Sequence, residues 1–100
     1  MPAFHNLMSA SPVEIKRKKL GKKVDGLYHP PGSLCDGSLP RIDIDIRLTN
    51  EEELDTLVHE CIHHTLPYLN EETVIAAGTM IAAILWSDGW RKTDDNATGL

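Results

Sequence analysis

The feature that most constrains the fold is an apolar segment close to the carboxyl end of the chain. Residues 73–86 contain no charged side chain, while Asn70 and the pair Asp88-Gly89 supply signals that start and stop a helix over 71–87. A helix that is apolar on nearly all sides has to be buried on several of them. The segment is too short to cross a bilayer, so we predict no membrane partner.

A second helix is predicted immediately before this one. Thr49 or Asn50 can cap a helix whose first turn carries three glutamates, Glu51–Glu53, where carboxylates interact favourably with the helix dipole. Pro67 cannot continue the helix, which should therefore end near His64. Because the linker to the apolar helix is short, the two helices should fold back on one another as an antiparallel hairpin.

The clearest strand of the sequence is Arg41 to Leu48, in which apolar and charged residues alternate. We expect one face of this strand to pack and the other to contact solvent. The expected packed residues are Ile42, Ile44, Ile46 and Leu48, and the expected solvent-facing residues are Asp43, Asp45 and Arg47.

The residues before this strand predict two further elements. Ser11 can cap a short helix from Pro12 to about Leu20, and Gly21 can end it. Val24 to Tyr28 can form a second strand, followed by a loop from His29 to Pro40 that is rich in proline, glycine and serine. The predicted fold class is therefore α+β, with a small antiparallel or mixed sheet packed on the helical hairpin.

The chain should fold as one domain, because one hundred residues are too few for two. Residues 1–10 show no periodicity and are predicted to form a flexible amino-terminal arm. Residues 92–100 are polar and are predicted to form a flexible tail. The folded domain is expected to span residues 11–91.

Charge and cysteine content limit the kinds of binding partner and the cellular compartment that we expect. The formal net charge is −5, and six of the ten Lys and Arg residues lie between Lys16 and Lys23. We interpret this run as a solvated basic face, because the chain as a whole is too acidic for general binding to nucleic acid. Two cysteines, Cys35 and Cys61, are too few for a secreted disulfide scaffold, and no apolar signal segment begins the chain. A soluble, cytoplasmic protein is therefore predicted.

The residues that carry chemistry lie on the first helix of the hairpin, where His59-Glu60-Cys61-Ile62-His63 forms the pattern H-E-x-x-H. A spacing of four residues puts both imidazoles on one face, about one turn apart, so that they can share a zinc ion. The intervening Glu60 can then act as general base toward a metal-bound water. A motif this short also occurs by chance, so the surrounding residues have to support it.

The hairpin supplies a third ligand, because it brings the start of the second helix beside His63. Both Glu71 and Glu72 arrive there. Glu71 shares a helix face with apolar residues such as Val74 and Ile81, where a carboxylate is costly unless a cation neutralises it. This favours Glu71, with Glu72 as the alternative. Either residue can also be read as an ordinary glutamate of a helix amino terminus, stabilised by the dipole.

The stretch from His59 to Arg91 resembles small zinc metallopeptidases of bacteriophages and bacteria. The resemblance is carried by H-E-x-x-H-H at 59–64, the segment Pro67–Val74, the pair Leu85-Trp86 and the triplet Gly89-Trp90-Arg91. More broadly, the pattern is similar to that of the gluzincins, in which a glutamate on the following helix completes the metal site. The resemblance covers about residues 24–91 and is strongest in the second half.

This resemblance implies a minimal zincin that hydrolyses peptide bonds. It implies one Zn²⁺ per chain held by His59, His63 and a glutamate at 71 or 72, with Glu60 as general base toward a zinc-activated water. In zincins a strand beside the active-site helix pairs with extended substrate, and Arg41 to Leu48 is expected at that position. If the gene belongs to a phage, the compartment is the host cytoplasm.

The sequence also departs from the larger gluzincins, which have a second subdomain and a Tyr or His that stabilises the oxyanion. The candidates for that role here are His64, Tyr68 and Arg91, none of them specified by spacing. This leaves open a non-catalytic, zinc-stabilised binding or regulatory module, or a metal-free interaction domain. Other transition ions such as manganese, iron or cobalt can use the same ligands. The oligomeric state also stays open, because the apolar helix needs more cover than one small sheet offers.

Overall fold

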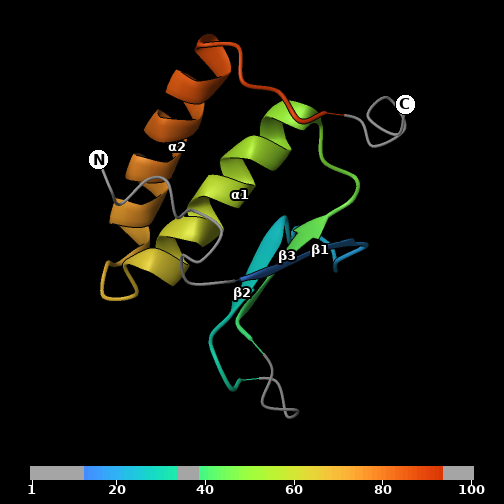
Figure 1. Ribbon diagram of the computed structural model, residues 1–100, viewed down its shortest axis with the longest axis vertical. Coiled ribbons are helices and arrows are strands. Elements are labelled where there is room, and N and C mark those ends of the chain that lie inside the picture. Colours follow the sequence, from blue (N-terminus) through green and yellow to red (C-terminus); the bar gives the residue numbers. More distant parts are fainter. Residues whose placement is uncertain (1–12, 34–38, 94–100) are drawn as a thin grey trace, which may run out of the picture.

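The computed structural model describes residues 13–33 and 39–93 and contains three strands followed by two helices (Figure 1). The strands are β1 (Glu14–Lys18), β2 (Gly26–His29) and β3 (Arg41–Asp45). The helices are α1 (Asn50–Thr65) and α2 (Glu71–Ser87). This is the predicted α+β class. The predicted arm at 1–10, the tail beyond residue 93 and Cys35 lie outside the described residues.

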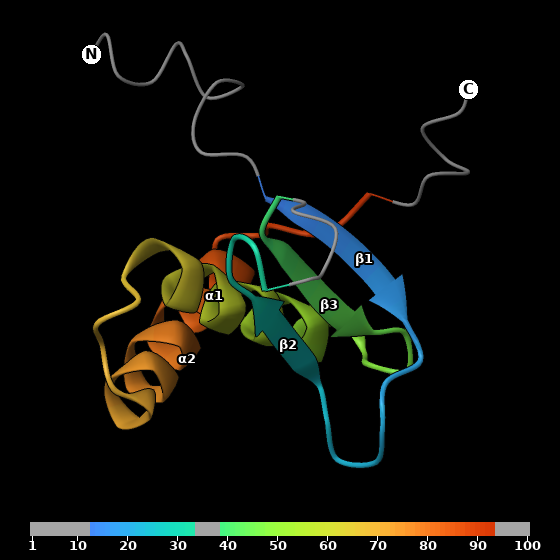
Figure 2. The same cartoon turned by 90° about the horizontal axis from the view of Figure 1, so that it is seen from below.

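The three strands form one mixed sheet in the order β1-β3-β2. The central strand β3 runs parallel to β1 and antiparallel to β2, with Ile42 opposite Ile15 on one side and Tyr28 on the other. Backbone groups on both edges of β3 are therefore already paired. The prediction that a peptide docks along Arg41 to Leu48 is wrong for this reason. The strand that lies beside α1 and also forms an edge of the sheet is β2 (Figure 2).

The predicted helix from Pro12 to about Leu20 is wrong, because residues 14–18 within this range form the strand β1. Local signals favoured a helix, but five residue pairs with β3 hold the segment extended. All five residues of β1 are exposed, and three of them are Lys or Arg. Lysine on an exposed edge strand discourages pairing with other chains. The basic run is thus partly the edge of the sheet.

The strand predicted over Arg41 to Leu48 is confirmed in its first part and ends at Asp45. Ile42 and Ile44 are fully buried, as expected, whereas Ile46 lies beyond the strand and is exposed. Asp43 and Asp45 were expected in solvent, yet they are only 2% and 5% exposed.

Arginines explain how these two carboxylates can be buried. Nη2 of Arg41 donates a hydrogen bond to Oδ2 of Asp43 at 3.1 Å, and Nη2 of Arg47 donates one to Oδ2 of Asp45 at 2.7 Å. A carboxylate that is paired and hydrogen-bonded in this way can leave water at a tolerable cost. Alternation along the strand could not reveal these partners.

Both predicted helices and their caps are confirmed. Thr49 caps α1 through a capping box with Glu52, in which each side chain accepts a hydrogen bond from the other residue's backbone N–H. Asn70 caps α2, its side-chain oxygen accepting a hydrogen bond from the backbone N–H of Thr73 at 2.8 Å. Gly89 follows α2 with a φ of 97°, a conformation that favours glycine.

The elements form three layers in which α1 lies between the sheet and α2 (Figures 1 and 2). The buried residues of α1, Thr56 and Glu60, face the sheet, where Gly26 of β2 approaches them closely. On the other side, Gly78 of α2 packs against the backbone of His59. Among the described elements, α2 contacts α1 alone.

The prediction that α2 is buried on several sides is wrong for the described chain. The buried residues of α2 are Val74, Gly78 and Ala82, which lie on a single face. The opposite face is apolar and exposed, with Met80 67% exposed. The reason is that the small sheet covers α1 and does not reach the second helix. Neither helix combines the length and apolar character needed to cross a membrane.

Candidate metal centre

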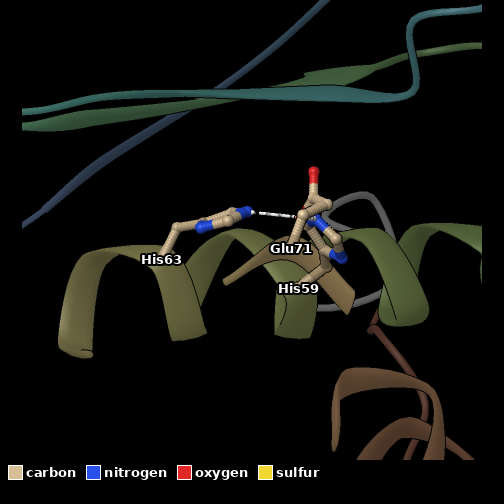
Figure 3. A group of neighbouring side chains, drawn as sticks. All are labelled: His59, His63 and Glu71. Carbon is tan, nitrogen blue, oxygen red and sulfur yellow. Dashed lines mark hydrogen bonds and ion pairs between the residues drawn. The ribbon is translucent and has the colours of Figure 1, made fainter. Parts of the chain in front are cut away.

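Three side chains that could hold a metal ion converge where α1 meets the start of α2. Nε2 of His59 and Nε2 of His63 each lie 3.0 Å from the same carboxylate oxygen of Glu71. The two imidazole nitrogens lie 3.2 Å from each other. Figure 3 shows the three side chains pointing toward one another, two from α1 and one from α2.

The spacing of these three atoms fits one tetrahedral zinc. Ligand atoms about 2.1 Å from a tetrahedral zinc ion lie roughly 3.4 Å apart, close to the three distances observed here. Imidazole nitrogen and carboxylate oxygen are also the donor types of catalytic zinc sites, which keep a fourth position open. Glu71 retains 63% of its side-chain exposure, so solvent reaches the cluster. The residues present therefore fit the metal that their sequence pattern implies.

The local sequence explains why these residues meet. The spacing of four places His59 and His63 one turn apart, and their rings lie edge to face with centroids 4.8 Å apart. After α1, the backbone N–H of Leu66 donates to Ile62, and the chain turns over four residues into the cap of α2. Glu71 is the first residue of α2 and is directed at the histidines by this turn. Glu72 is exposed and does not belong to the cluster.

Glu60 lies beside the cluster on the sheet-facing side of α1 and is only 7% exposed. Its Cγ is close to the backbone of Gly26, so the carboxyl group lies between helix and sheet. Burial raises the pKa of Glu60 above its ordinary value, while the nearby His59 and His63 lower it in part. A carboxyl group with a raised pKa is better matched to proton transfer near neutral pH.

The group of His59, His63 and Glu71, which we term the metal cluster because its atoms could hold an ion, opens onto a small cavity of about 300 Å³ between the start of β2 and α1. His59, Glu60 and Glu71 line one side of it, and residues 23–26 line the other. In Figure 3, β2 passes over the cluster. The strand that borders the site is therefore β2, whereas the resemblance to zincins implied the strand at 41–48.

The three candidate oxyanion donors lie in different places. His64 is engaged on the sheet side, where its Nδ1 forms a 2.8 Å hydrogen bond with the hydroxyl of Tyr28. Tyr68 is 78% exposed in the linker between the helices. Arg91 lies beyond the far end of α2, with its guanidinium 3.4 Å from the ring centre of Trp86. The structure does not bring Arg91 to the metal cluster.

Sequence reasoning missed two residues that shape the site. Tyr28 was predicted only as part of a strand, yet its hydroxyl positions His64. Burial raises the pKa of Tyr28, so that its hydroxyl keeps its proton. Gly26 was not singled out, although it allows β2 to approach Glu60. A lone glycine within a predicted strand was the available signal for such a close approach.

The chain has no significant match among models of protein families, among curated proteins or among solved structures. The function has to be argued from the residues and their geometry.

Proposed function

We propose that this protein is a zinc-dependent metallopeptidase whose ion is held by His59, His63 and Glu71. The observation that carries the proposal is the convergence of three ligand atoms within 3.2 Å of one another. An ordinary surface pair of histidines would not need the first residue of the next helix to face both imidazoles. Glu72, the alternative ligand, is set aside because it lies outside this cluster.

Zinc bound here would act as a Lewis acid that polarises a scissile carbonyl and increases the acidity of water. The chain itself supplies the proton transfer. Glu60 takes a proton from the attacking water and delivers it to the amine of the leaving group. Its position between α1 and β2 excludes bulk water from one side of the carboxylate.

The substrate would bind as an extended peptide along the outer edge of β2. The backbone N–H of Asp45 donates to the carbonyl of Asp25, so alternate residues of β2 direct their backbone groups toward β3. By that alternation, the backbone groups of Gly26 and Tyr28 are directed to the outer edge. A peptide that adds to a sheet edge gains affinity from main-chain hydrogen bonds with outward-facing backbone groups of this kind.

The compartment proposed for this activity is the cytoplasm, or the host cytoplasm if the gene belongs to a phage. Cys61 is a free, half-buried thiol, and burial raises its pKa. A thiol of this kind is suited to a reducing compartment.

The metal site is tested by measuring zinc content and affinity for the wild type and two matched variants. Glu71→Gln removes a proposed ligand, whereas Glu72→Gln makes the same change one residue further along the exposed end of α2. We expect about one zinc per chain in the wild type and in Glu72→Gln. Zinc affinity should fall more than about tenfold in Glu71→Gln. Equal affinity of the two variants would exclude Glu71 as a ligand.

Catalysis is tested with a library of fluorogenic peptides and the variant Glu60→Gln. This variant keeps the size of the side chain but cannot accept the proton, so turnover should be lost while zinc stays bound. A residual rate below about 1% of the wild type is expected, since general base catalysis contributes about 10²- to 10⁴-fold. Undiminished hydrolysis by Glu60→Gln would refute the role of this residue.

A second function is favoured by the positions of the oxyanion candidates. Tyr68 is exposed, Arg91 is remote, and His64 already has Tyr28 as its partner. The same fold could therefore serve as a zinc-stabilised binding or regulatory module without catalysis. Zinc that raises the melting temperature, together with no cleavage of any peptide by the wild type, would support this alternative over the peptidase.

A further inference from the structure

A second cavity lies at the other end of the helical hairpin, between the first half of α1 and the last half of α2. Its volume is about 420 Å³, within the range typical of ligand pockets. The lining is mainly apolar and consists of Leu54, Leu57, Leu85, Trp86 and Trp90. The chain segment after α2 closes one side, where it crosses from α2 back toward α1 (Figure 1).

This cavity is separate from the metal cluster. At 100° per residue, Leu54 lies about 140° around α1 from His59 and about 180° from His63. The cavity beside His59 and Glu71 shares no lining residue with this one. Whatever binds here is therefore not the peptide segment that reaches the metal.

Cations predominate among the charged residues that line this apolar cavity. Among the described residues, Arg17, Arg91 and Lys92 line it together with one acidic residue, Glu53. Glu53 accepts a hydrogen bond from Nε of Arg17 at 3.2 Å and lies 3.8 Å from Nζ of Lys92. One carboxylate facing three cations leaves a local positive excess, in a chain whose formal net charge is −5.

Arg91 is held in place by an aromatic ring and by backbone carbonyls. Its guanidinium stacks on Trp86, and Nη1 donates to the backbone carbonyls of Trp86 and Trp90 at 2.9 Å and 2.8 Å. Within residues 13–33 and 39–93, no carboxylate pairs with Arg91. A preordered guanidinium with unused N–H groups is well suited to bind a carboxylate.

We propose that this cavity binds an amphiphile with an aliphatic chain and a single carboxylate, whose chain occupies the apolar lining and whose carboxylate is bound by Arg91 and Arg17. The size of the cavity, its apolar walls and its cationic lining residues all fit this class of ligand. This binding site does not depend on the metal centre.

The experiment uses the tryptophans as reporters, because the chain contains two and both line the cavity. Octanoate is titrated into the full chain while tryptophan fluorescence is recorded, with octan-1-ol as the ligand that lacks the carboxylate. We expect a saturable change with octanoate and about tenfold weaker binding of octan-1-ol, as for loss of one charge-assisted hydrogen bond. Absence of a saturable change, or equal affinity for the two ligands, would overturn the proposal.

Charge variants locate the carboxylate. Arg91→Gln should weaken octanoate binding about tenfold. Arg17→Gln, on the exposed strand β1, serves as a second variant if Arg91→Gln fails to fold, and should weaken binding about threefold. Lys22→Gln removes the same charge outside the cavity and should leave affinity unchanged. Equal losses in all three variants would mean general charge attraction and would refute the site.

A further control separates this cavity from the metal centre. His63→Ala and added chelator should leave octanoate binding unchanged. Loss of octanoate binding in either condition would place the ligand at the metal cluster and overturn the proposal. Failure of the peptidase tests, by contrast, has no bearing on this result.

Discussion

Gly26 is the position at which one methyl group should change the stability of the fold most directly. A Cβ atom added there would lie 2.6 Å from Cγ2 of Thr56 on α1. It would also lie 3.3 Å from the backbone oxygen of Asp43 and 3.3 Å from Cγ of Glu60. The residue does not have the positive φ seen at Gly32 and Gly89, so the backbone itself would accept alanine. The cost of Gly26→Ala is therefore steric, and β2 and α1 must move apart to accommodate it.

The size of the effect follows from two opposing contributions. Inserting a methyl group into a packed contact costs about 1–3 kcal/mol. Replacing glycine by alanine also stabilises the folded state by up to about 1 kcal/mol, because it lowers the conformational entropy of the unfolded chain. A net loss of about 1–2 kcal/mol in the free energy of unfolding should lower the melting temperature by roughly 4–16 °C in a domain of this size.

The assay is thermal and urea denaturation followed by circular dichroism, carried out in chelator because a ligand bound to the folded state would mask the change. Gly21→Ala is the matched control, since nothing lies within 4 Å of a Cβ at that position. Thr56→Ser removes Cγ2 and should recover much of the loss when combined with Gly26→Ala. Equal stability of Gly26→Ala and Gly21→Ala, or no recovery in the double variant, would refute the close approach of β2 to α1.

Two further predictions concern the sheet and the cap of α1. Burial raises the pKa of Asp43, but hydrogen bonds from Arg41 and His29 outweigh it and hold the pKa of this carboxyl below its ordinary value. The stabilisation from this depressed pKa is present above the unfolded pKa of about 3.9 and is lost as the pH falls through the folded pKa. Asp43→Asn should therefore be less stable than the wild type at pH 7, and it should lose less stability on acidification. Urea denaturation from pH 7 to pH 2 measures both effects. Thr49→Ala removes one half of the capping box and should cost about 1 kcal/mol, or roughly 4–8 °C in melting temperature; an unchanged melting temperature would mean that the cap contributes nothing to α1.

The helical hairpin could be predicted because its signals are local. Thr49, Asn70 and Pro67 act within one or two turns of the residues they affect, so caps and the interhelical turn can be read from neighbouring residues. The i, i+4 spacing of His59 and His63 is likewise independent of the rest of the fold. The preference for Glu71 over Glu72 came from the helical periodicity of α2, and the structure places Glu71 in the cluster.

The sheet was harder to predict because its interactions join residues far apart in the chain. The segment at 14–18 follows a helix-start signal that begins at Ser11, yet pairing with β3 holds it as a strand. Asp43 alternates like a solvent-facing residue, but Arg41 and His29 allow it to be buried. Tyr28 and Gly26 gain their roles only because β2 lies against α1, which no short pattern in the sequence specifies.

The sequence by itself therefore indicated the two histidines and the general base of the proposed metal centre, and it narrowed the third ligand to Glu71 or Glu72. Those residues lie on one helix and at the start of the next, and the five-residue linker at 66–70 leaves the chain few ways to arrange them. The tertiary structure alone decided which strand borders the proposed metal centre and which strands form the edges of the sheet, because strand order depends on contacts between distant residues. It also decided that Arg91 belongs to a separate cavity, since the length of α2 carries its carboxyl end away from the metal cluster.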